Sequence, residues 1–142
     1  MENIQVLTKT NHIKKAQEKE DIMLNKERQE EVVELCQHLI QKQSYSGHED
    51  GVAGVLEEQL KKKGFDSVTV DKYGNVIGCI KGNRPGKKIL FDGHIDTVPV
   101  TDETEWQYPP FAAEIHDGKI YGRGTSDMKG AVAGFVTAAA AF

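Results

Sequence analysis

Hydrophobic positions recur at helical spacing in two stretches between residues 26 and 63. Apolar residues three or four positions apart form one face of a helix, which predicts two amphipathic helices here. The first would bury Val32, Leu35, Cys36, Leu39 and Ile40, and the second Val52, Val55, Leu56 and Leu60. Ser46 and Glu49 precede the second helix at the spacing of a capping box, which makes Ser46 the expected N-cap residue. Lysines at 61–63 followed by Gly64 predict its end.

Alternating apolar and polar positions predict short strands further along the chain. The alternating segments are residues 67–70, 76–80, 113–116 and 119–121, with turns at 71–75 and at Asp117 and Gly118. They indicate two small hairpins. Residues 88–91 are a continuous apolar run, which is typical of a strand buried on both faces. His94 follows that run, at the carboxyl end where α/β sheets gather their ligand sites.

The two ends of the chain differ in character. Residues 1–25 are polar and show little periodicity, so we expect an N-terminal arm ahead of a domain at 26–142. From Met128 to Phe142 the chain is apolar nearly all round, which predicts a buried helix. No Gly, Pro or capping residue closes that helix, so we expect the sequence to be truncated. For Trp106, Tyr108 and Phe111, in the loop at 99–111, the pattern favours packing over a substrate wall.

Composition narrows the classes of partner. The 142 residues are 38% hydrophobic and carry a net charge of −4, which argues against nucleic acid or an anionic membrane as partner. No apolar run approaches the roughly 20 residues of a membrane-spanning helix, and no signal peptide is recognisable. Cys36 and Cys79 are too few for a disulfide framework and are expected to be buried thiols. We therefore expect a cytoplasmic protein.

Three side chains suggest chemistry. His94 and Asp96 stand two positions apart in an extended segment, so the carboxylate can hold one ring nitrogen and leave the other for a metal. Ordinary hydrogen bonds at a strand end are the commoner role for such a pair taken alone. Asp127 follows Gly122 and Gly124 and precedes the last helix. Taken alone, an aspartate at that place is most readily a helix cap. Held by such a loop, its two oxygens are also able to bridge two cations about 3.5–4 Å apart.

Competing interpretations of these segments are weaker. A phosphate loop at 122–124 is excluded because no Gly-Lys-Ser/Thr sequence follows it and an acid stands where phosphate would bind. The remaining histidines form no His-x-x-x-His pair, so we expect structural or solvent-facing roles for them: His12, His38, His48 and His116.

Residues 93–99 (GHIDTVP) followed by residues 122–130 (GRGTSDMKG) resemble the acetylornithine deacetylase, succinyl-diaminopimelate desuccinylase and aminoacylase family of two-zinc metallopeptidases and amidohydrolases. Residues 46–49 and 71–76 are also similar to early segments of that family. The resemblance extends over about residues 26–142. Either motif alone is modest evidence, but both in this order and spacing are specific.

The resemblance implies an α/β fold, the N-terminal part of a three-layer αβα zinc-hydrolase catalytic domain. It makes His94 a ligand of one zinc and Asp127 the bridge between two. It makes Asp96 the catalytic residue that orients His94. The family's Glu-Glu pair, its remaining ligands and its lid or dimerisation domain lie beyond this chain.

The implied function is metal-dependent hydrolysis of an amide bond in a small N-acyl amino acid or short peptide. The resemblance implies two divalent metal ions, with zinc expected and cobalt or manganese as alternatives, and a full-length protein that forms a homodimer. We expect the 142-residue chain alone to be inactive. Two alternatives stay open: a non-catalytic remnant or binding module that keeps the fold, and a hydrolase with a different leaving group.

Overall fold

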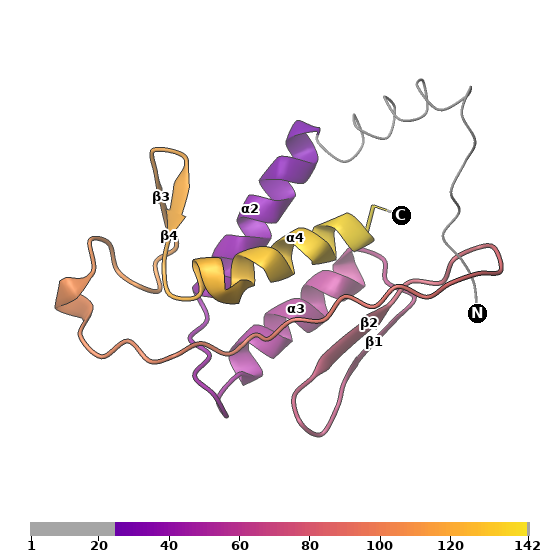
Figure 1. Cartoon of the computed structure of the whole chain (residues 1–142), viewed down its shortest axis with the longest axis horizontal. Coiled ribbons are helices and arrows are strands. Elements are labelled where there is room, and N and C mark those ends of the chain that lie inside the picture. The colour runs from indigo at the N-terminus through magenta and orange to yellow at the C-terminus, as the bar shows by residue number, and fades with distance from the viewer. Residues whose placement is uncertain (1–24, 142) are drawn as a thin grey trace.

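The computed structural model describes residues 25–141, so the predicted arm at 1–25 lies almost entirely outside the described residues. Figure 1 shows a mixed α/β arrangement of helices and two small hairpins. The elements are α2 (Lys26–Ile40), α3 (Asp50–Lys62), β1 (Ser67–Val70), β2 (Val76–Cys79), β3 (Glu114–His116), β4 (Lys119–Tyr121) and α4 (Gly130–Ala139), with a short helical turn at Glu103–Glu105 and an irregular, kinked turn at Thr125–Lys129. The α/β class is therefore confirmed.

The hydrophobic core lies among the three helices, and α2 contacts both α3 and α4. Its buried members from α2 and α3 are Leu35, Cys36, Leu39, Ile40, Val52, Leu56 and Leu60, and from α4 Val132, Ala133 and Val136. The two amphipathic helices predicted from the spacing are confirmed, and their apolar faces meet in this core. Full burial of one such aliphatic side chain contributes about 1.5–3 kcal/mol.

Both predicted hairpins are present. β1 pairs antiparallel with β2 and packs against α3, while β3 pairs antiparallel with β4. In the first turn the Asp71 carboxylate accepts hydrogen bonds from the backbone N–H groups of Tyr73 and Asn75, at 2.8 and 3.0 Å. In the second turn Asp117 and Gly118 both have positive φ, as an Asp-Gly hairpin turn requires.

The predicted buried strand at residues 88–91 is wrong. This segment is extended but belongs to no strand of the structure, and Figure 1 shows it running on from the β1–β2 hairpin as plain chain. Leu90 is 87% exposed, and Ile89 and Phe91 are also more than half exposed. An apolar run forms a buried strand only where other strands flank it, and within residues 25–141 none does. Phe91 alone of the three stacks on an aromatic ring, that of Phe135 in α4, with centroids 5.7 Å apart.

The predicted cap of α3 is also wrong. Its N-cap is Glu49, whose side chain makes no cap hydrogen bond and instead accepts from the backbone N–H of Gly47. The hydroxyl of Ser46 donates to Asp96, so a tertiary partner takes the group that a capping box would use. The predicted C-terminal end is confirmed, because Gly64 has φ +81° just after the last turn.

Two expectations of burial are only partly met. The last helix buries one face, with Val132 and Val136 inside and Ala131 exposed, rather than its whole circumference. Cys36 is a buried free thiol, as predicted, but Cys79 is exposed because it ends β2 in a two-stranded sheet with little to cover it.

The loop aromatics pack separately. Tyr108 stacks on His116 at 3.8 Å, Phe111 meets Tyr45 edge to face, and Trp106 lies under the guanidinium of Arg123. Each of these three contacts ties the loop at 99–111 to a different segment. No helix within residues 25–141 is long and apolar enough to cross a membrane.

We predict that Leu39→Ala destabilises the chain by about 2–5 kcal/mol, because Leu39 is fully buried in the core that α2, α3 and α4 share and its loss leaves a cavity. Urea unfolding monitored by circular dichroism measures this. Leu90→Ala removes the same atoms from an exposed site and should change stability by no more than about 0.5 kcal/mol. Equal effects at the two positions would contradict this assignment of the core.

Candidate metal centre

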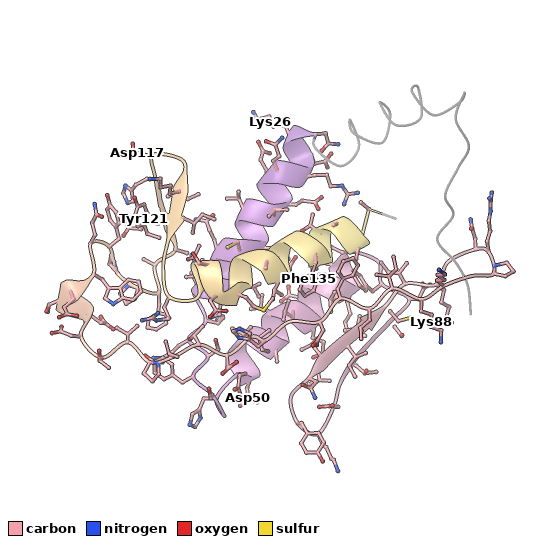
Figure 2. The ribbon with its side chains drawn as sticks, in the orientation of Figure 1. Lys26, Asp50, Lys88, Asp117, Tyr121 and Phe135 are labelled. Carbon is pink, nitrogen blue, oxygen red and sulfur yellow. The ribbon has the colours of Figure 1, made fainter. Side chains whose placement is uncertain are left out.

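The two motifs, far apart in sequence, form opposite walls of one open cleft of about 290 Å³. Figure 2 shows the side chains of the described residues. The labelled Tyr121 ends β4, directly before residues 122–127 in the sequence, and the labelled Phe135 lies in α4, which follows them. The lining residues are His94, Asp96, Thr97 and Val98 on one side and residues 122–127 on the other. The structure therefore brings all three predicted site residues together.

His94 and Asp127 face each other across the cleft. The Nε2 atom of His94 lies 2.9 Å from Oδ1 of Asp127. The His94 side chain is about half exposed and that of Asp127 is 87% exposed, so both groups are open to a ligand from solvent. An imidazole nitrogen and a carboxylate oxygen, both of which are able to bind a metal ion, thus converge on one point of the cleft.

The other ring nitrogen of His94 is held from behind by Asp96. Nδ1 lies 3.1 Å from the backbone carbonyl oxygen of Asp96 and 3.2 Å from its carboxylate Oδ1. The carboxylate contact is the one that the two-residue spacing suggested. The contribution of the backbone carbonyl was not foreseen, because side-chain identity carries no information about where a carbonyl points.

These surroundings set the charges of the site. The pKa of His94 is raised, first by the backbone carbonyl of Asp96 and then by the carboxylate of Asp127. Both ring nitrogens face acceptors, so the imidazolium form is favoured because it donates from both. The pKa of Asp96 is lowered, mainly because the hydroxyl of Ser46 donates to its ionised form.

Close backbone approach shapes the wall that carries Asp127. Gly124 has φ +84°, and a Cβ there would lie 2.6 Å from Cγ2 of Thr97. A Cβ at Gly122 would lie 2.5 Å from Cγ2 of Ile40. The backbone N–H of Lys129 closes the turn by donating to the carbonyl of Gly124 at 2.9 Å. The peptide bond between Asp127 and Met128 is cis.

Sequence reasoning missed two side chains that support the site. Lys129 is completely buried, and its ammonium donates to the backbone carbonyl of Lys42 at 2.8 Å. Burial lowers its pKa to about 8. Ser46 donates to Asp96 instead of capping a helix. The role of Lys129 could have been suspected from the sequence, because a lysine stands directly before an apolar helix. Nothing in the sequence around Ser46 indicated that it would donate to Asp96.

The donors present fit part of a metal centre. An imidazole nitrogen and a carboxylate oxygen are common zinc ligands, and in such sites the ring nitrogen that does not bind the metal typically donates to an oxygen acceptor. Within residues 25–141, no group of three or more His, Cys, Asp or Glu side chains is placed to hold a metal ion. His38, His48 and His116 do not line the cleft, and His116 pairs with Glu114 at 2.7 Å.

We predict that the pKa of His94 in the metal-free chain lies above the ordinary value of about 6.5. Because the folded value is raised, the stabilisation is full below that ordinary value and is lost as pH rises through the folded pKa. An NMR titration of the His94 ring measures it. Asp127→Asn should lower this pKa toward the ordinary value, whereas Asp117→Asn in the distant turn should leave it unchanged. A parent value at or below 6.5 would show that the imidazole does not lie between these acceptors.

We predict that Gly124→Ala destabilises the chain more than Gly118→Ala does. Both glycines have positive φ, so each alanine incurs a backbone cost of about 1–2 kcal/mol. Only at Gly124 would the new methyl also collide with Thr97, whereas at Gly118 no atom lies within 4 Å. Urea unfolding of both variants isolates the cost of the collision. Equal losses of stability would mean that the two walls are not held this closely.

Comparison with known families agrees with this geometry. Residues 90–142 match the model of peptidase family M20/M25/M40. The matched segment contains both walls of the cleft and all three of His94, Asp96 and Asp127. The match supports this broad family and indicates a metallopeptidase or amidohydrolase.

Proposed function

We propose that the protein is a metal-dependent hydrolase that cleaves an amide bond in a small N-acyl amino acid or short peptide. The observation that carries the proposal is the 2.9 Å approach of His94 Nε2 to Asp127 Oδ1, between two motifs that lie within the segment matched by the peptidase family. An exposed imidazole and an exposed carboxylate that converge in an open cleft suit an exchangeable cation better than they suit a structural ion pair.

His94 and Asp127 would hold the metal. We expect two divalent cations, with zinc as the first choice and cobalt or manganese as alternatives. Bound cations would supply Lewis acidity, which polarises the scissile carbonyl and acidifies water. Asp127 has a second carboxylate oxygen in addition to the one that faces His94, which suits the bridging role that the resemblance implies.

The chain's own contribution is orientation. When Nδ1 of His94 carries the proton, it donates to Asp96, and the lone pair of Nε2 points into the cleft. Asp96 therefore acts through His94 rather than on the substrate. The positive charge of the metal would replace the proton that otherwise sits between Nε2 and Asp127, so metal binding should be favoured as pH rises.

The site needs further groups. A catalytic zinc usually has three protein ligands, and Asp96 and Asp127 are the only carboxylates among the described residues that line the cleft. We propose that the general base and the remaining ligands come from a larger catalytic domain. We also propose that the complete protein is a homodimer and that residues 1–142 alone are inactive.

A second candidate is a non-catalytic binding module. It is favoured by one observation, that the described residues bring only two metal donors to the same point. In that case the cleft would keep its shape and bind a ligand without turning it over.

The deciding measurement is metal content and amide hydrolysis by the protein encoded by the complete reading frame, assayed on N-acyl amino acids and dipeptides. We expect about two metal ions per chain. His94→Ala should lower both metal content and activity, because it removes a ligand. His38→Ala, which removes a histidine of α2 outside the cleft, is the matched control and should change neither. Absence of both metal and hydrolysis would favour the binding module.

A further inference from the structure

The loop between α2 and α3, residues 41–49, reaches the histidine side of the site through Ser46. Its hydroxyl donates to Oδ2 of Asp96 at 2.5 Å, while the other carboxylate oxygen, Oδ1, lies 3.2 Å from Nδ1 of His94. Each oxygen of Asp96 therefore has its own partner. A short hydrogen bond to an ionised carboxylate is among the stronger kinds. It limits rotation of the carboxylate and so keeps Oδ1 turned toward the imidazole.

The same loop also holds the backbone on either side of Asp96. The Ser44 hydroxyl donates to the carbonyl of Ile95, and the Ser44 carbonyl accepts from the N–H of Thr97, both at 2.7 Å. Tyr45 and Thr97 form a parallel bridge. Ser44 is fully buried, so water does not compete for these bonds. The extended segment that carries His94 is thus docked on the loop by its main chain.

On the opposite side, Lys129 ties the Asp127 turn to this loop. The Lys129 backbone N–H closes that turn, and its buried ammonium donates to the carbonyl of Lys42. Within residues 25–141 Lys129 has no carboxylate partner. Burial of an unpaired ammonium is costly, and an apolar chain of similar length would fill the same space more cheaply. What the lysine adds is the directed bond to the loop.

We propose that the α2–α3 loop is the element that holds His94 and Asp127 in register. Ser46 acts through the carboxylate of Asp96, and Lys129 acts through the carbonyl of Lys42. Both are positioning residues, because neither lines the cleft. Their importance for hydrolysis rests on the proposed function, but the positioning itself belongs to the metal-free chain and is measurable there.

The first experiment uses the metal-free 142-residue chain and the ¹⁵N shifts of the two His94 ring nitrogens, recorded above the pH at which the titration of this ring is complete, so that the ring is neutral. We expect the Nδ1–H form to predominate, because two oxygen atoms of Asp96 face Nδ1, whereas one oxygen atom, that of Asp127, faces Nε2. Ser46→Ala should lower the ratio of Nδ1–H to Nε2–H severalfold. Ser46→Thr keeps the hydroxyl and should restore the ratio. Ser67→Ala, an exposed serine in β1, is the matched control and should have no effect.

Unchanged ring shifts in a folded Ser46→Ala chain would overturn the role of Ser46. Failure of the threonine variant to restore the ratio would do the same, because it would show that the hydroxyl is not the active feature. Neither readout needs metal or substrate. A protein with no hydrolytic activity would therefore count against the proposed function and leave this test intact.

The second experiment tests Lys129 in the protein encoded by the complete reading frame, with Co²⁺ alone as the probe. Lys129→Met keeps the apolar stem and removes the ammonium, so the Asp127 turn loses its bond to the loop. We expect the affinity for Co²⁺ to fall about tenfold, as is usual when groups that orient metal ligands are removed. Lys119→Met, an exposed lysine on β4, should leave it unchanged. Unaltered affinity in a folded Lys129→Met chain would overturn the role of Lys129.

Discussion

The packing of α4 on α2 underlies the arrangement of the other elements. Cys36 and Leu39 of α2 share one core with Val132 and Val136 of α4. The turn at Thr125–Lys129 runs directly into α4, so the burial that places the helix also places Asp127. Apolar burial has no direction of its own, and it brings the turn only to the neighbourhood of His94.

Directed polar contacts then complete the alignment that burial begins. Ser44 of the loop between α2 and α3 bonds to the backbone of Ile95 and Thr97. Lys42 of the same loop accepts a hydrogen bond from Lys129. Because such bonds weaken steeply when their geometry is lost, they define positions more narrowly than contact between apolar side chains does. The packing of the helices therefore places the site approximately. Its precise geometry comes from a loop whose own side chains do not line the cleft.

The electrostatic character of the cleft follows from this arrangement. One imidazole lies between two aspartates, and both of its nitrogens face oxygen atoms. Such a place attracts positive charge, either as a proton on the ring or as a cation between Nε2 and Asp127. The exposure of both groups allows exchange between these two states, whereas a fully buried pair of the same composition would resist it.

Much of the local structure was predictable because its causes are local. Helical spacing in α2 and α3, the Asp-Gly turn before β4 and the glycines at 122 and 124 all express rules that act within a few residues. The spacing of His94 and Asp96 likewise predicted a shared side of the chain. The failures occurred where a distant partner decides the outcome. The strand expected at 88–91 has no flanking strands within residues 25–141, and Ser46 donates to Asp96, fifty residues away, instead of to the start of α3.

Residue types and their spacing were enough to predict the helices, the hairpins and the three residues that carry the candidate chemistry. The folded chain adds that His94 and Asp127 lie 2.9 Å apart, that Ser46 of the α2–α3 loop supports His94 through Asp96, and that Lys129 ties the Asp127 turn to the same loop. The physical reason is that residue type sets which bonds a group is able to make, whereas the packing of distant segments sets which partner it reaches.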